Sequence, residues 1–116
     1  MEWVTIIMGL LGPFFAKCHS NSEQAARDPK EFLRANYDEA TGKMSRDLVR
    51  KGMPQTRKAI RKAHRDASKE ERKTFPRYSK TDIYQMTEKK LVEAMQAPTE
   101  EVEAAFAVAA QLPDDE

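Results

Sequence analysis

Residues that favour β-strands form a run at only one place in this chain, across residues 3–8. Elsewhere Ala, Glu, Lys, Arg, Gln and Met dominate, and these residues favour helices over strands. Many of the apolar residues are Ala or Met, so large branched side chains are scarce. The sequence therefore predicts an all-α fold, a small bundle of about four to six short helices with a hydrophobic N-terminal segment.

The length of 116 residues corresponds to one domain with a modest core. We expect residues 1–17 to form a hydrophobic anchor or interface segment, residues 18–112 to form the helical domain, and residues 113–116 to be a polar tail. The single cysteine, Cys18, excludes an internal disulfide framework and leaves only intermolecular pairing open. A reducing compartment is the default expectation for such a chain.

Capping residues predict where the first helices begin. Residues 20–23 are spaced as a capping box, and Asp28 followed by Pro29 marks the strongest local helix start. We expect the helix after Asp28 to run to about Thr41, to stop at Gly42, and to bury three side chains. These are Phe32, Leu33 and Tyr37.

The middle of the chain contains two predicted helices separated by breakers. A short helix is expected to begin at Ser45 and to end within residues 51–54, because Gly52 and Pro54 both disfavour helix continuation. From Gln55 to Lys73, nineteen residues without a breaker predict a separate, long basic helix.

Two more helices are expected in the C-terminal part of the chain. The first begins at Ser79 or Thr81 and carries apolar residues through Met95, with a break near Thr87 left open. The last begins at Thr99, where acids in the first turn suit the helix dipole. It is expected to bury Val102, Ala105, Phe106 and Ala109.

Residues 88–107 have the dimensions of a helix-turn-helix unit, in which the second helix reads the DNA major groove. The exposed face of that second helix offers Glu100, Glu103 and Ala104 instead of side chains that bind bases or phosphates. Because phosphates repel acids, we interpret these residues as a helical hairpin that packs on the core or on a protein partner.

Charge is divided sharply along the chain. Residues 43–80 contain 14 Lys and Arg against 4 Asp and Glu, a net charge of +10, whereas residues 91–116 contain 7 acids and no base. Residues 55–80 are therefore a candidate surface for nucleic acid or anionic lipid. Its candidate polyanion-binding residues are Arg57, Lys58, Arg61, Lys62, Arg65, Lys69 and Arg77. The alternative is a solvated helix, partly neutralised by neighbouring acids and by the acidic C-terminal helix.

Residues 3–16 carry no charge. As a helix these residues would span about 21 Å, less than the roughly 30 Å of a bilayer core. The segment lacks the positive flank of a signal peptide, since Glu2 is acidic. We expect it to meet a membrane surface or a protein partner, or else to be covered by the other helices. Its candidate anchor residues are Trp3, Ile6, Ile7, Leu10, Leu11, Phe14 and Phe15.

No enzyme chemistry is expected. Two His, one Cys and the absence of a Gly-rich phosphate loop leave no recognisable catalytic arrangement in the sequence. Cys18 and His19 have no third ligand nearby and His64 stands alone, so no metal site and no cofactor are predicted.

Two functional hypotheses follow. The first is a non-enzymatic accessory or assembly protein, anchored through residues 3–16 to a membrane or a larger complex, with its basic helix facing an anionic partner. The second is a soluble nucleic-acid-associated or virion-type assembly protein whose N-terminal segment is core or subunit interface, with homo-oligomers open to it. The expected location is membrane-associated with the C-terminal part in the cytoplasm, or cytoplasmic.

Overall fold

The computed structural model describes residues 27–109. The predictions for the anchor segment at residues 3–16, for the capping box at residues 20–23 and for the polar tail lie outside these residues. Five helices and two short strands make up the described part, which confirms the all-α class. They are α3 (Pro29–Ala35), β1 (Tyr37–Asp38), β2 (Lys43–Met44), α4 (Arg46–Asp66), α5 (Lys69–Lys73), α6 (Lys80–Gln96) and α7 (Thr99–Ala109).

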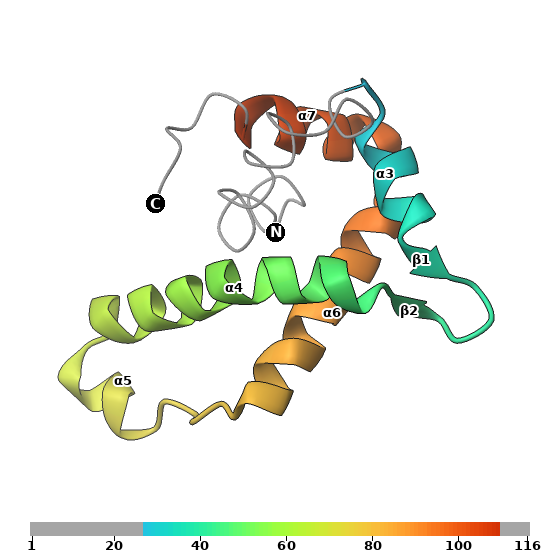
Figure 1. Cartoon of the computed structure of the whole chain (residues 1–116). Helices are drawn as coiled ribbons and strands as arrows, with labels where there is room; N and C mark the ends of the chain where they lie inside the picture. Colours follow the sequence, from blue (N-terminus) through green and yellow to red (C-terminus); the bar gives the residue numbers. More distant parts are fainter. Residues whose placement is uncertain (1–26, 110–116) are drawn as a thin grey trace.

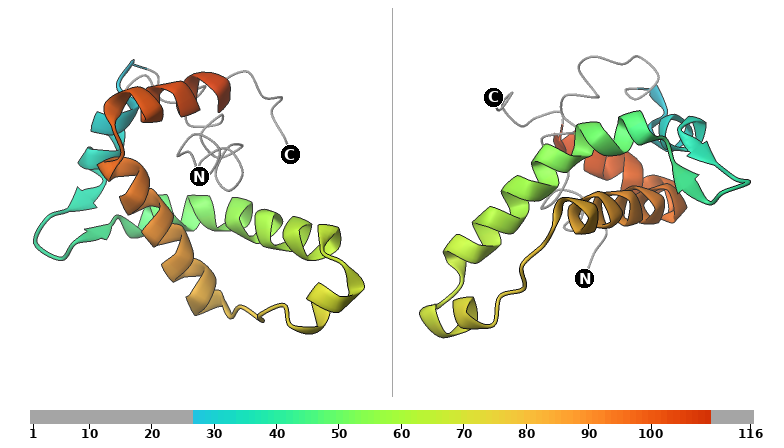
Figure 2. Two further views of the ribbon diagram at one scale, coloured as in Figure 1. Left: turned by 180° about the vertical axis from the view of Figure 1, so that it is seen from behind. Right: turned by 60° about the horizontal axis from the view of Figure 1, so that its bottom comes forward.

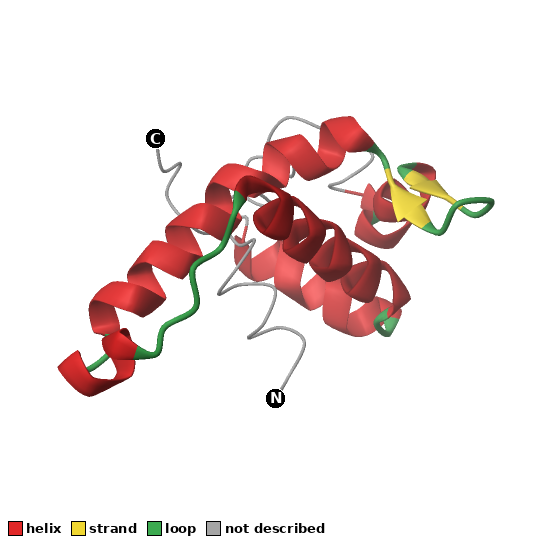
Figure 3. Ribbon diagram, turned by 90° about the horizontal axis from the view of Figure 1, so that it is seen from below, coloured by secondary structure: helices red, strands yellow, loops and turns green. Residues whose placement is uncertain are grey.

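Two long helices, α4 and α6, cross and form the framework of the fold (Figure 1). α3 packs against both α6 and α7, and β2 lies against α6. At the far end of α4, α5 and the segment after it lead the chain back to α6, as the two views of Figure 2 show. The hairpin of β1 and β2 projects from the opposite end of the helices (Figure 3).

α3 is shorter than the sequence suggests. It ends at Ala35, so the prediction of a helix that continues to Thr41 is wrong. Asn36 donates its side-chain Nδ2 to the carbonyl of Phe32 at 2.9 Å, and its own carbonyl accepts from the Ser45 amide at 2.6 Å. These hydrogen bonds give the backbone an alternative to helix continuation, which ends the helix here.

A tight hairpin replaces the rest of the predicted helix. β1 and β2 pair antiparallel, with Tyr37 opposite Met44 and Asp38 opposite Lys43. Gly42 takes a left-handed conformation with φ of 69°, and its amide donates to the carbonyl of Asp38 at 2.8 Å. The hairpin places Met44 in the core. Of the three side chains predicted to be buried in this region, Leu33 is fully buried, whereas Phe32 and Tyr37 are half-buried.

The left-handed conformation of Gly42 gives a stability prediction. Gly42→Ala is expected to lower the free energy of unfolding by about 1 to 2 kcal/mol, because a Cβ is disfavoured at this φ. Gly42→Asn is expected to cost less, since Asn tolerates this conformation better than Ala. Urea unfolding of the two variants measures both values, and equal stability of Gly42→Ala and the parent protein would contradict the prediction.

α4 is one continuous helix, so the prediction of two helices separated at Gly52 and Pro54 is wrong. Pro54 lacks an amide and leaves the carbonyl of Arg50 without its helical partner, but both residues are exposed, so water can serve that carbonyl. Gly52 and Thr56 are buried on the face that meets α6. Tertiary packing therefore outweighs the local helix-breaking tendency.

The predicted continuation of the basic helix to Lys73 is also wrong, because α4 ends at Asp66. Ala67 is extended, and Ser68 begins the new helix α5 by accepting the Glu71 amide at 3.2 Å. No residue of α5 is buried, so tertiary packing does not oppose a new helix start here. The local cap at Ser68 therefore decides where α4 ends and α5 begins.

α6 begins at the first of the two predicted positions, Ser79. Ser79 and Asp82 form a complete capping box, with the Asp82 amide 3.1 Å from Ser79 Oγ and the Ser79 amide 2.9 Å from Asp82 Oδ2. The helix continues without a break through Thr87, which is fully buried.

Thr87 forms a buried hydroxyl pair with Thr56 where α6 crosses α4. The two Oγ1 atoms lie 2.9 Å apart, Thr56 Oγ1 lies 3.2 Å from the carbonyl of Gly52, and Thr87 Oγ1 lies 2.8 Å from the carbonyl of Ile83. Two hydroxyl protons serve three contacts, so one hydroxyl donates across the crossing while the other donates within its own helix.

The hydroxyl pair is expected to behave as one unit. Thr56→Val or Thr87→Val removes the bond between the helices and leaves the remaining hydroxyl its own helical carbonyl, at a cost of about 1 kcal/mol. The double variant also loses the remaining hydroxyl bond within a helix, but it leaves no buried hydroxyl that lacks a partner, so it should cost about 1 kcal/mol as well. Urea unfolding of the three variants measures the coupling, and simple addition of the two single costs would rule it out.

α7 confirms its predicted start at Thr99 and the predicted burial of Val102, Ala105 and Phe106. The side chain of Ala109 lies outside the described residues. α7 leaves α6 at a corner and packs on α3, so the expected helical hairpin is corrected to an angled pair (Figures 1 and 2).

The core lies where α3, α4, α6 and α7 meet. Its buried members are Leu33, Met44, Leu48, Val49, Leu91, Ala94, Ala97, Val102, Ala105 and Phe106. Lys30 supports this junction from α3, because its Nζ donates to the carbonyl of Ala97 at the C-terminal end of α6, at 2.6 Å. A positive charge at this end suits the helix dipole.

Candidate polyanion-binding surface

Three arginines line one cleft beside the C-terminal half of α4. Arg57, Arg61 and Arg65 are four residues apart and therefore share one side of the helix. The cleft has a volume of about 500 Å³ and lies between α4 and the segment that leads from α5 to α6. Its other lining residues are Ile60, His64, Phe75, Pro76, Tyr78 and Ile83. We call this site the arginine cleft.

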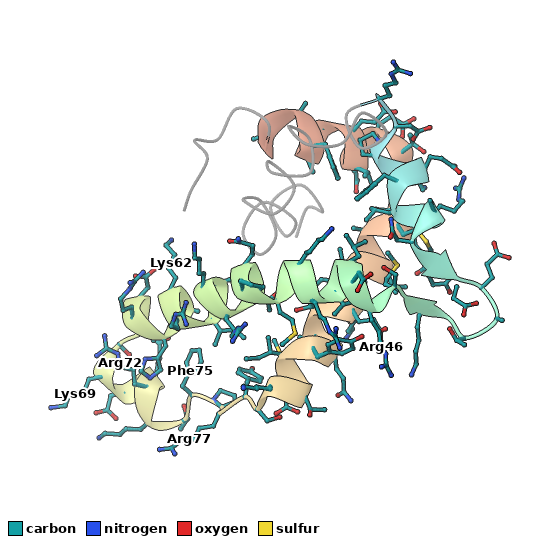
Figure 4. All side chains as sticks on the ribbon, viewed as in Figure 1. Arg46, Lys62, Lys69, Arg72, Phe75 and Arg77 are labelled. Atoms are coloured by element: carbon teal, nitrogen blue, oxygen red, sulfur yellow. The ribbon has the colours of Figure 1, made fainter. Side chains whose placement is uncertain are left out.

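The turn after α4 builds the opposite wall of the arginine cleft. Arg72 reaches back from α5 and donates Nε to the carbonyl of His64 at 3.1 Å and Nη2 to the carbonyl of Arg65 at 2.8 Å. These bonds satisfy two carbonyls at the end of α4 and stabilise the turn in which the chain reverses direction. Phe75 then packs edge-on against the His64 ring, with centroids 5.1 Å apart. Figure 4 shows Phe75 between α4 and the returning segment.

The arginine cleft is strongly positive. No acid is among its lining residues. Within residues 27–109, the guanidinium groups of Arg57, Arg61 and Arg65 have no hydrogen-bond or ion-pair partner. Neighbouring like charges at this spacing repel by roughly 0.2 to 0.5 kcal/mol per pair in a helix. A bound anion would remove this repulsion.

The structure does not bring together all seven bases that the sequence selects. Lys62 points away from the arginine cleft and pairs with Asp66 at 3.7 Å, and Lys69 projects outward from α5 (Figure 4). Lys58 is half-buried and does not line the arginine cleft. Arg77 lines a separate, smaller cleft of about 430 Å³ with Tyr78 and Lys89. We call this smaller site the bridging cleft.

The structure also contains a basic cleft whose bases are not among the seven predicted from the sequence. Its bases are Lys43, Arg46, Arg50 and Lys80, which come from β2, α4 and α6, and its volume is about 700 Å³. We call it the second basic cleft. The spacing of Arg46 and Arg50 from the later arginines places all of them on one face, but only if residues 46–66 form one helix. The expected break at Pro54 concealed that spacing.

The described part was compared with the requirements of a metal site and of a membrane span. Within residues 27–109, no group of three or more His, Cys, Asp and Glu side chains is placed to hold a metal ion. Over the same range, no helix has both the length and the apolar character needed to cross a membrane. Comparisons of the chain with protein-family models, with curated proteins and with solved structures find no match. The residues that line the clefts are therefore the basis for a functional proposal.

Proposed function

We propose that this protein is a non-enzymatic accessory or assembly protein that binds single-stranded nucleic acid through the arginine cleft. The observation that supports the proposal is the row of Arg57, Arg61 and Arg65, which have no partner within residues 27–109 and line a cleft with aromatic and apolar walls. Of the two hypotheses drawn from the sequence, this is a specific form of the nucleic-acid-associated one.

The residue types suit a phosphate chain that carries aromatic bases. Each guanidinium is planar, always charged, and able to bind a phosphate through two hydrogen bonds. Tyr78 is 38% exposed and Phe75 is half-buried in the same cleft. Bases stack on such rings at about 1 to 3 kcal/mol per base in single-strand binding proteins.

The shape of the site favours a strand over a lipid surface. Arg57, Arg61 and Arg65 face a concave space that is closed on one side by the segment from Phe75 to Tyr78. A flat bilayer cannot enter such a cleft, whereas a flexible strand can. Lys62 and Lys69 do not line the arginine cleft and point away from it (Figure 4).

Binding assays with three anionic probes test the proposal. The full-length protein is titrated at about 50 mM salt with a fluorescent single-stranded oligonucleotide, with vesicles containing phosphatidylserine, and with polyglutamate. Preferential binding of the oligonucleotide that weakens steeply with added salt is expected. Absence of oligonucleotide binding, or stronger binding to vesicles, would refute the proposal.

We further propose that residues 3–16 tether this domain to a membrane or to a larger complex. The support is their uncharged, largely apolar composition beside a domain that is rich in charge. Fractionation of the full-length protein and of a protein that lacks residues 1–17 tests this role. The full-length protein should sediment with membranes or as a large assembly and the truncated protein should not, and monomeric full-length protein without detergent would contradict the tether.

A further inference from the structure

We infer that the arginine cleft is one end of a continuous track for a single strand, which passes around the N-terminal half of α6 and ends in the second basic cleft. This inference rests on the proposed function and deepens it, because it specifies the path and the extent of the bound strand. It also assigns a role to bases that the sequence-based selection omits.

Both end clefts draw their arginines from the same face of α4. Arg46, Arg50, Arg57 and Arg61 lie within about 60° of one another around the helix axis, at 3.6 residues per turn. Arg46 and Arg50 line the second basic cleft, and Arg57 and Arg61 line the arginine cleft. The row from Arg46 to Arg65 extends about 28 Å along the helix.

The bridging cleft connects the two end clefts around α6. Tyr78 lines both the arginine cleft and the bridging cleft, and Gln85 lines both the bridging cleft and the second basic cleft. Ile83 and Tyr84 face the arginine cleft and the second basic cleft, respectively. The three clefts therefore adjoin one another in the order arginine cleft, bridging cleft, second basic cleft.

Charge along this path is almost entirely positive. The three clefts contain nine bases and two acids, Asp82 and Glu88, besides His64. Asp82 is already engaged, because its carboxylate accepts the Ser79 amide. Tyr78 and Tyr84 provide rings on which bases can stack near either end.

A flexible strand fits this path better than a duplex or a folded acidic surface does. The path bends around α6, because the adjacent residues Ile83 and Tyr84 of this helix face different clefts. A stiff duplex cannot follow such a bend at low energetic cost. A single strand carries one negative charge per nucleotide and can bend at each nucleotide.

The experiment compares oligothymidylates of about 4 and about 12 nucleotides, a range of lengths typical of single-strand sites. It uses the full-length protein and charge-matched double variants. Arg46→Gln with Arg50→Gln removes two bases from the second basic cleft, and Arg57→Gln with Arg61→Gln removes two from the arginine cleft. Lys51→Gln with Lys62→Gln is the control, because neither lysine lines any of the three clefts.

Both arginine double variants are expected to weaken binding of the longer oligonucleotide about tenfold, and the lysine control less than about threefold. One long strand should bind each protein molecule, and the parent protein should bind the long strand much more tightly than the short one. Loss of binding only in the Arg57 and Arg61 variant, or two long strands per protein, would overturn the track and leave the proposed function intact.

Two other results would overturn the proposed nucleic-acid ligand as well as the track. If the parent protein binds neither oligonucleotide at low salt, the proposed function fails and the track fails with it. If polyglutamate displaces the long strand at an equal concentration of charges, the occupant is an acidic protein segment and not a nucleic acid, which also overturns the inference.

Discussion

Replacement of Arg57, Arg61 and Arg65 together by glutamine is expected to weaken binding of a single-stranded oligonucleotide by about 100-fold. Each charged hydrogen-bonding contact with phosphate is worth about 1 kcal/mol or more, and 1.4 kcal/mol corresponds to a factor of ten. Three contacts therefore contribute about 3 kcal/mol. Fluorescence anisotropy at about 50 mM salt measures the dissociation constants of the parent protein and of the variant.

A charge-matched variant separates the position of the bases from their number. Lys51→Gln, Lys62→Gln and Lys69→Gln also remove three positive charges, but these lysines do not line any of the three clefts. We expect this control to weaken binding by less than about fivefold. Arg61 and Arg65 are exposed and Arg57 is half-buried, so the arginine variant should unfold within about 1 kcal/mol of the parent protein. Equal losses in the two variants would mean that binding depends only on net charge.

The largest expected effect on stability comes from Phe106. Its side chain is 1% exposed and is the largest fully buried side chain among the described residues. Phe106→Ala removes most of this ring from the core that α3, α4, α6 and α7 share, at a cost of about 3 to 5 kcal/mol. Domains of this kind have total stabilities of about 5 to 15 kcal/mol, so the variant should be partly unfolded under mild conditions.

Urea unfolding followed by circular dichroism measures this loss. Val108→Ala is the control on the same helix, because Val108 is 43% exposed, and it should change stability by less than about 0.5 kcal/mol. Phe106→Leu should fall between the two, since it leaves a smaller cavity. A loss below about 1 kcal/mol for Phe106→Ala would show that α7 does not belong to the cooperative core.

The helix starts are the part of the fold that the sequence predicts best. Ser45, Ser79 and Thr99 each mark the beginning of a helix as expected. At Ser45 and Ser79 the signal is local, because the capping side chain and the amide that it binds are three residues apart. Such a signal needs no knowledge of the tertiary structure.

The helix ends were harder to predict because distant contacts decide them. Gly52 and Pro54 lie inside α4, where Thr56 is buried and bonded to Thr87, a residue 31 positions away. Asn36 ends α3 with the help of Ser45, which lies beyond the hairpin. Neither contact can be read from local helix propensity.

The candidate site was predicted in its composition but not in its arrangement. The seven bases predicted from the sequence include Arg57, Arg61 and Arg65, and the structure places all three at one cleft. The predicted set also includes Lys62, which points away from the arginine cleft, and it omits Arg46, which lies on the shared face. The path of the chain through α5 and back to α6 decides which side of α4 forms the arginine cleft, and the continuity of α4 through Pro54 places Arg46 on the shared face.

The salt dependence of binding tests the proposed contact set most directly. For a single strand, the slope of the logarithm of the binding constant against the logarithm of salt concentration is about −0.7 per neutralised phosphate. The parent protein should therefore show a steep slope, and the variant without Arg57, Arg61 and Arg65 should show a slope smaller by about 2 in magnitude. The variant without Lys51, Lys62 and Lys69 should keep a slope close to that of the parent. Identical slopes for the parent and the arginine variant would contradict phosphate binding in the arginine cleft.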